Sequence, residues 1–186
     1  MRLFLAIKIE PSDKYLQTIE ALKHKLRFDK ISWSKPEMAH LTFKYFGRTP
    51  DKRLKQIDKY LQIASKNVEP FQLNINKIGA FGSSYRPSVL WFGVEEEKLL
   101  KSVHHKLFSQ LKFAGYTPDR GHFVPHITIA RIHKTTDKSW FWKSVEEYQT
   151  EWIQQVEVKE MHLFNSIDSP RGVIHKLINT YEFSKE

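Results

Sequence analysis

The sequence predicts an α+β fold: two pseudo-symmetric lobes of largely antiparallel sheet, with outer helices, around a central cleft. Three observations lead to this prediction. About eight segments have the pattern of strands and roughly three or four have that of helices. A His-apolar-Thr-apolar motif occurs once in each half of the chain. No linker, low-complexity tract or charge block divides the 186 residues, so we expect residues 1–186 to form one domain of two similar lobes.

The first half of the chain alternates between the two patterns. The alternating pattern of a strand at the start of the chain ends at Glu10-Pro11. Apolar residues at helical spacing follow. Gly47 is expected to end a strand, and Pro50 and Asp51 to begin a helix. The predicted elements are a strand at Arg2–Ile9, a helix over 11–27, strands at Ile31–Ser34 and His40–Phe46, and a helix from Thr49 to about Ser65.

The rest of the chain repeats this organisation. Gly82–Pro87 is expected to join two strands, and Gly115 to end a helix in the left-handed conformation. A loop rich in Pro, Asp and Gly over 117–125 precedes the second motif. The predicted elements are strands at Phe71–Phe81 and Val89–Val94, a helix over 96–114, a strand at His126–Ile132, a helix at Asp137–Tyr148, and strands at Ile153–Phe164 and Val173–Phe183 with a turn at 168–172 between them.

The chain is basic, with 30 Lys and Arg against 21 Asp and Glu and a formal net charge of +9. The whole excess lies in residues 1–93, where 17 basic residues stand against 8 acidic ones. An excess confined to one half favours a surface that meets a polyanion or a phosphorylated ligand. A lysine-rich, solvated helix surface would give the same count, so the charge alone does not decide between the two.

Several classes of protein are excluded or disfavoured by what the sequence lacks. It has no cysteine, which excludes disulfides, thiolate catalysis and Cys-ligated zinc. Its apolar start is broken by Lys8 and Glu10 before it reaches the length of a signal peptide, and its apolar runs are too short to span a bilayer. No His-Glu-x-x-His spacing occurs. We therefore expect a cytoplasmic protein with no metal site and no membrane partner.

The repeated motif is the strongest feature. Residues 40–43 are His-Leu-Thr-Phe, and residues 126–129 are His-Ile-Thr-Ile. Because side chains alternate along a strand, the histidine and threonine of each motif share one face while the two apolar residues fill the other. Two such strands side by side would make a cleft with two imidazoles and two hydroxyls. A single copy is most simply an ordinary polar strand face, but two copies in equivalent positions favour a function.

This cleft suits the hydrolysis of a phosphodiester or the opening of a cyclic phosphate. Such a reaction needs a base for the attacking water and an acid for the departing oxygen, and histidine serves in either role near neutral pH. Threonine hydroxyls and backbone N–H groups can hold the phosphoryl oxygens. By alternation Lys44 would add charge to the motif face, and Tyr45 and Phe46 are candidates for stacking on a base, with strand core as their alternative. Of the other histidines, His122 and His133 flank the second motif strand and could contact the substrate, whereas the rest, His162 and His175 among them, are expected to be structural or solvated.

Further segments around the motifs carry a resemblance to a known family. They are Arg2-Leu3-Phe4-Leu5-Ala6-Ile7, Phe46-Gly47, Arg86-Pro87-Ser88-Val89-Leu90-Trp91 and Pro125-His126-Ile127-Thr128-Ile129-Ala130-Arg131. With the two motifs, the chain resembles the 2H phosphoesterases, and in particular the RNA 2′,3′-cyclic phosphodiesterase branch, also known as the bacterial and archaeal 2′-5′ RNA ligase family. The resemblance covers nearly the whole chain. It implies two lobes related by a pseudo-twofold axis through the cleft.

The resemblance also implies an activity and a set of site residues. The activity is the metal-independent opening of RNA 2′,3′-cyclic phosphate ends to 2′-phosphates, with reversible 2′-5′ joining in some members. The implied catalytic pair is His40 and His126, with Thr42 and Thr128 on the phosphate and Arg131 on the nucleotide. Our hypothesis is that His126 activates water and His40 protonates the ribose 3′ oxygen, although the near-symmetric site leaves the reverse assignment open.

Other functions remain possible at this stage. One is a phosphodiesterase for 2′-5′ oligonucleotides or small cyclic nucleotides, and another is an RNA-binding module without turnover. The partner expected in each case is an RNA or a related nucleotide. We expect no cofactor and a monomeric chain.

Overall fold

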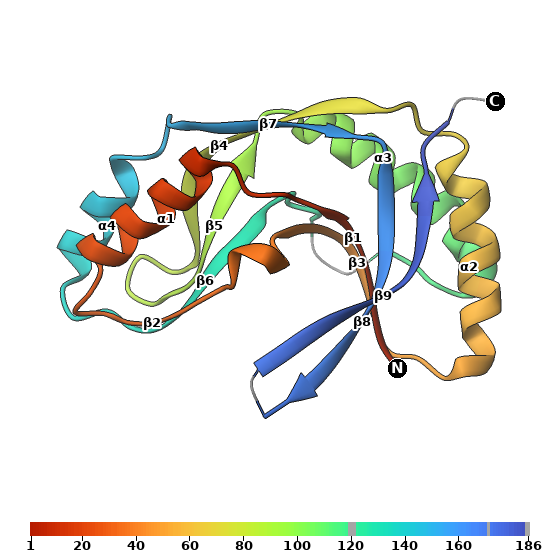
Figure 1. Ribbon diagram of the computed structural model, residues 1–186, viewed down its shortest axis with the longest axis horizontal. Helices are drawn as coiled ribbons and strands as arrows, with labels where there is room; N and C mark the ends of the chain where they lie inside the picture. The colour runs from red at the N-terminus through yellow and green to blue at the C-terminus, as the bar shows by residue number, and fades with distance from the viewer. Residues whose placement is uncertain (119–121, 171, 185–186) are drawn as a thin grey trace.

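The computed structural model describes residues 1–118, 122–170 and 172–184. Within these ranges the chain forms nine strands, four α-helices and two short 3-10 helices (Figure 1). In chain order they are β1 (Arg2–Lys8), α1 (Asp13–Lys25), β2 (Lys30–Trp33), η1 (Pro36–Met38), β3 (His40–Arg48), α2 (Asp51–Ser65), β4 (Phe71–Gly82), β5 (Pro87–Val94), α3 (Glu97–Leu111), η2 (Lys112–Ala114), β6 (Ile127–Lys134), α4 (Lys138–Glu146), β7 (Trp152–Val158), β8 (Glu160–Ser169) and β9 (Gly172–Glu182).

The strands form one curled antiparallel sheet. Its order is β7-β4-β5-β6-β3-β1-β8-β9, and β2 pairs with the outer part of β6. Three further strands follow on each side of the β6–β3 junction. The two motif strands, β6 and β3, thus lie in the middle of the sheet, with β5 beside β6 and β1 beside β3. The prediction of an α+β fold with a largely antiparallel sheet is confirmed.

The helices cover one face of the sheet and connect its two sides. On one side α1 packs against β7 and α4 against β4, and on the other α2 packs against α3 and β9. Figure 1 shows these two groups at opposite ends of the molecule. Helix α1 follows β1 in the chain but packs beside β7, at the far end of the sheet. The two sides therefore share a continuous core, with fully buried residues such as Leu5, Leu41, Phe92 and Ile127.

Most predicted strand limits differ from the observed ones by one or two residues, and three differences change how the sheet or the motif strands are described. The single strand expected at Ile153–Phe164 is two strands, β7 and β8, which pair with β4 and β1 in different parts of the sheet. The one sign of this corner in the sequence is the polar pair Lys159-Glu160, which shifts the alternation by one residue between Val158 and Met161. Strand β3 does not end at Gly47, which adopts φ +68° and lets the strand run on to Arg48. Strand β6 begins at Ile127, one residue after His126.

Two predicted connections fall partly on residues that the structure does not describe. In the loop expected over 117–125 these are residues 119–121, and in the turn expected at 168–172 this is Arg171. They lie outside the described residues. Among the residues that are described, no helix is long and apolar enough to cross a membrane.

Candidate active site

The two motif histidines are held in the same way. His40 Nδ1 lies 2.7 Å from the Met38 carbonyl oxygen, and His126 Nδ1 lies 2.8 Å from that of Val124. A carbonyl oxygen can only accept, so Nδ1 carries the hydrogen in both rings. Nε2 is therefore the atom through which each ring can accept a proton when neutral and donate one when charged.

The junction of β3 and β6 brings the two motifs together. Leu41 pairs with Ile127, which in the described residues is the one residue pair that joins these strands. In an antiparallel register this places Thr128 across from His40, and His126 across from Thr42. The histidines thus lie on a diagonal, each beside the threonine of the other motif. Leu41 and Ile127 are both fully buried on the opposite face.

Burial and proximity both act on the protonation of this pair. Burial lowers the pKa of His40, the Met38 carbonyl partly opposes this, and a charge on His126 lowers it further. Burial also lowers the pKa of His126, against the effect of the Val124 carbonyl. The two imidazoles are close enough for a charge on one to disfavour a charge on the other. One protonated and one neutral ring is therefore favoured over two charged rings.

Each motif strand contains a bulge at the last residue of its motif. Along β3 the register with β1 skips Phe43, and along β6 the register with β5 skips Ile129. A bulge shifts the alternation by one residue. Strict alternation would turn Arg131 to the opposite face, but after the shift both Tyr45 and Arg131 are exposed. The Thr42 hydroxyl donates to Tyr45 Oη at 3.2 Å, which places that ring beside the motif.

The same bulge places Lys44 differently from the prediction. The expectation that Lys44 lies on the face of His40 and Thr42 is wrong, because its side chain is buried and its Nζ lies 5.5 Å from the centre of the Phe108 ring on the helical side of the sheet. Phe46 is also buried, edge-on to Tyr116 at 4.9 Å, and is part of the core. Of the three candidates that follow the first motif, the structure brings only Tyr45 to the site.

Different aromatic rings surround the two histidines. His126 meets the Phe81 ring edge-on at 4.8 Å, and Phe81 contacts Trp91 at 5.2 Å. The Trp91 ring lies directly on Gly79, where a Cβ would come within 2.3 Å of a ring carbon. His40 instead contacts Phe4 and His175, each with a centroid distance of 5.1 Å. The site is therefore symmetric in its histidines and threonines but not in its walls.

His175 is the residue of this site that sequence reasoning missed. It lies on β9 and contacts both Phe4 and His40, and burial and the neighbouring His40 lower its pKa to about 4. We had expected an ordinary sheet histidine. No local pattern marks it, because the contact depends on the order β3-β1-β8-β9 and on a Phe4 side chain between the strands. In the described part of the chain, no three His, Asp or Glu side chains converge so that they could hold a metal ion.

Comparisons with known proteins agree on one family. The family model described as "2′-5′ RNA ligase superfamily" matches residues 11–168. The chain is similar to the RNA 2′,3′-cyclic phosphodiesterase of Archaeoglobus fulgidus, with 27% identity over 182 residues that cover 98% of this chain and 100% of the relative. It is also similar to the RNA 2′,3′-cyclic phosphodiesterase of Thermotoga maritima, with 28% identity over 183 residues that cover 98% of this chain and 96% of the relative.

Solved structures show the same fold. A protein of Thermus thermophilus superposes with a TM-score of 0.79 at 22% identity, and the match covers all of both chains. Escherichia coli LigT in complex with 3′-AMP superposes with a TM-score of 0.75 at 18% identity, covering 99% of this chain and 98% of that one.

Proposed function

The chain belongs to the 2′-5′ RNA ligase superfamily, and we propose that it is an RNA 2′,3′-cyclic phosphodiesterase that opens cyclic phosphate ends to 2′-phosphates. The names of the relatives in Archaeoglobus fulgidus and Thermotoga maritima support this substrate. The observation that carries the proposal is the matched pair of histidines, each with Nδ1 on a backbone carbonyl and Nε2 left for chemistry. The basic excess of the first half suits a polyanionic substrate.

The reaction needs two proton transfers, and the pair supplies both. In the proposed step, neutral His126 takes a proton from water through Nε2 as the water oxygen attacks the phosphorus. The bond from phosphorus to the ribose 3′ oxygen breaks, and protonated His40 gives its Nε2 proton to that oxygen. Thr42 and Thr128 donate hydrogen bonds to the phosphoryl oxygens as their charge grows. The product is a 2′-phosphate, and two RNA ends are joined through a 2′-5′ linkage when a 5′-hydroxyl takes the place of water in the same step.

The direct test uses a short RNA that ends in a 2′,3′-cyclic phosphate. We expect the protein to convert it to a 2′-phosphate in excess EDTA, and the His126→Ala protein to fail under the same conditions. A 3′-phosphate product would contradict the proposed direction of opening. Loss of turnover in EDTA that returns with a divalent ion would contradict a mechanism that needs only the two histidines.

The pH dependence follows from the lowered pKa values of His40 and His126. Because both lie below the usual 6.5, raising the pH above neutrality removes the proton that the acid needs. We expect kcat/KM to be bell-shaped with its optimum below about pH 6.5, and to fall about tenfold per pH unit on the alkaline side. The phosphate anion of a bound substrate stabilises imidazolium, so the profile of kcat should lie at higher pH. A kcat/KM that is flat from pH 5 to 9 would contradict this assignment.

Because of the two bulges, we expect substitutions of Arg131 and Lys44 to have opposite outcomes for kcat/KM: a loss for Arg131 and little change for Lys44. Arg131 is exposed on the motif side of β6, and a charged hydrogen bond to the substrate is worth about 1.5–3 kcal/mol. We therefore expect Arg131→Ala to lower kcat/KM about tenfold or more, by the same principle. Lys44→Met, which keeps the length of a buried chain, should leave kcat/KM within about twofold because Lys44 lies on the other face. Steady-state kinetics on one cyclic-phosphate RNA compares the two, and the reverse order of effects would contradict the placement.

A further inference from the structure

A pocket of about 320 Å³ opens beside His40, whose ring lines it, and does not include His126. One wall comes from the turn before β3, and the other from the sheet face at β8 and β9. The residues that form these walls are Met38, Ala39, His40, Phe164, Ile174 and His175. The volume is within the range of about 300–1,000 Å³ that is usual for small-molecule sites. It is large enough for one nucleoside.

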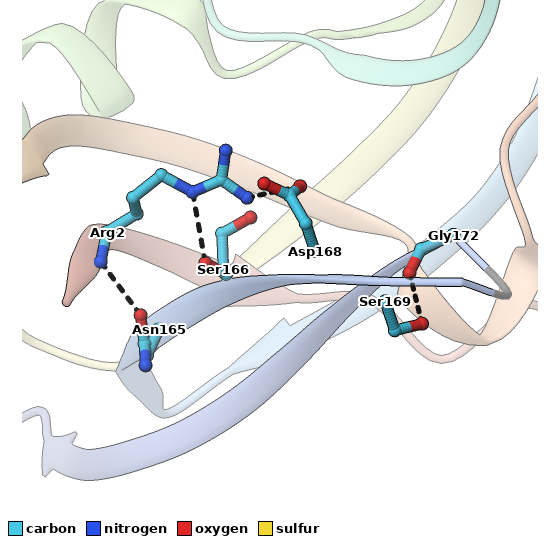
Figure 2. A network of polar contacts seen from close by, with 6 residues as sticks. All are labelled: Arg2, Asn165, Ser166, Asp168, Ser169 and Gly172. Carbon is cyan, nitrogen blue, oxygen red and sulfur yellow. Dashed lines mark hydrogen bonds and ion pairs between the residues drawn. The ribbon is translucent and has the colours of Figure 1, made fainter.

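The outer part of the β8–β9 hairpin forms the far wall of this pocket. Strand β1 pairs with β8 only as far as Asn165, so beyond this point the hairpin extends away from the sheet (Figure 1). Arg2 holds it at the point of exit (Figure 2). The Arg2 backbone N–H donates to Asn165 Oδ1 at 2.8 Å, and its guanidinium donates to the Ser166 carbonyl at 3.2 Å and to Asp168 at 2.5 Å. The wall is thus tied to the first residues of the chain.

The lining has the chemistry of a site for a base and a phosphate. Phe164 lines the pocket with a ring that is 8% exposed, and Ile174 is an apolar side chain that is 53% exposed. Lys8 and Lys35 also line the pocket, together with one carboxylate, Glu37. Lys8 forms an ion pair with the exposed Glu10, and such surface pairs hold a lysine only weakly. Both lysines belong to the half of the chain that carries the basic excess.

The orientation of His40 indicates which nucleotide can enter. Its Nδ1 edge faces Met38, which lines the pocket, whereas Nε2 on the other side of the ring must meet the terminal ribose. In the proposed step the ribose that carries the cyclic phosphate lies at Nε2, whereas the pocket lies next to the ring edge that carries Nδ1. Because the cyclic phosphate ends the RNA, any part of the substrate beyond this ribose is the strand on its 5′ side.

We propose that this pocket binds the penultimate nucleotide of the RNA, with its base against Phe164 and Ile174 and a backbone phosphate near Lys8 and Lys35. The proposal rests on the proposed function, since it extends the substrate from a cyclic nucleotide to a strand. The protein then distinguishes an RNA end from a free nucleoside 2′,3′-cyclic phosphate. It does so through binding outside the reacting atoms.

The test compares a nucleoside 2′,3′-cyclic monophosphate with a pentanucleotide that ends in the same cyclic nucleotide. We expect Ile174→Asp and Lys35→Glu each to raise KM for the pentanucleotide about tenfold, as for a lost base or phosphate contact. Both should leave kcat, and both constants for the mononucleotide, within about twofold. The matched controls are Leu177→Asp, an exposed apolar residue of β9 outside the pocket, and Lys98→Glu on α3, which changes the net charge equally. Neither control should affect either substrate.

A binding measurement separates this proposal from the proposed function. The probe is a pentanucleotide with a 2′-phosphate end and a 5′ fluorescein, followed by anisotropy. Weaker binding in the pocket variants alone supports the pocket, even if the native protein opens no cyclic phosphate and the proposed function fails. Equal binding by the native protein and the pocket variants overturns the pocket proposal. An equal rise in KM for the mononucleotide in the kinetic test also overturns it, because the pocket would then hold the terminal nucleoside.

Discussion

His126→Ala and His40→Ala are each expected to lower kcat by about 10²–10⁴, the usual contribution of one proton transfer. Each change removes the Nε2 that the proposed reaction uses, and leaves a carbonyl, Val124 or Met38, without its hydrogen-bond donor on an edge that water can reach. KM should change little, because the threonines that hold the phosphate remain. Steady-state kinetics in EDTA on a cyclic-phosphate RNA measures the effect.

The control for this pair is His105→Ala, an exposed histidine of α3 on the helical side of the sheet, which should keep full activity. The double variant His40→Ala, His126→Ala should lose much less than the product of the single losses, since an acid without its base already fails. Thermal unfolding should show both single variants to be folded. A His126→Ala protein with near-normal kcat would overturn the acid–base pair, whatever the protein binds.

The protonation roles can be separated with the same proteins. If His126 is the base, His126→Ala should remove the acid limb of the kcat/KM profile and keep the alkaline limb, because the remaining His40 must still be protonated. His40→Ala should do the reverse. The opposite pattern would exchange the two roles and would place the leaving oxygen on the side of Phe81. In that case the pocket beside His40 would be on the wrong side for the RNA strand.

The alternation of residues was enough to predict which side chains of each motif share a face. Histidine and threonine share one face of each motif and two buried residues lie on the other, as the structure has them at Leu41 and Ile127. Alternation failed at Lys44, because a bulge is a property of two strands and depends on what β1 places opposite β3. The sequence contains both strands but does not record the register in which they pair. The same effect on β6 leaves Arg131 exposed.

Contacts between distant strands could not be predicted from the sequence for a related reason. His175 reaches His40 because β9 pairs with β8, β8 with β1, and β1 with β3, so three pairings must be known before the contact can be seen. At Lys159 the polar pair Lys159-Glu160 marks a break in the alternation, but only the partners of β7 and β8 show that the chain turns a corner there and does not form a bulge within one strand. The local pattern thus predicted which residues face out together. It did not predict which other strands bring a further side chain, such as that of His175, into contact with the motif residues.

Ile127→Ala is expected to lower the free energy of unfolding by about 2–5 kcal/mol, as for other large apolar side chains cut back in a core. Ile127 is fully buried and pairs with Leu41 where the two halves of the sheet meet. The cavity would lie directly behind the histidines, so we also expect kcat to fall about tenfold or more in protein that is still folded, since small displacements of reacting groups are costly. Denaturant unfolding and kinetics at low temperature measure the two effects.

The matched control for Ile127→Ala is Ile153→Ala, another fully buried isoleucine, on β7 near the far edge of the sheet. It should cost a similar free energy of unfolding and leave kcat unchanged, because no motif residue lies on β7. Ile127→Val, which removes one methyl group, should cost only about 0.5–1.5 kcal/mol and keep most of the activity. Equal kcat values for Ile127→Ala and Ile153→Ala would show that the β3–β6 junction serves only stability. A selective loss in Ile127→Ala would mean that this single pair of core residues sets the distance across which the two histidines share one phosphate.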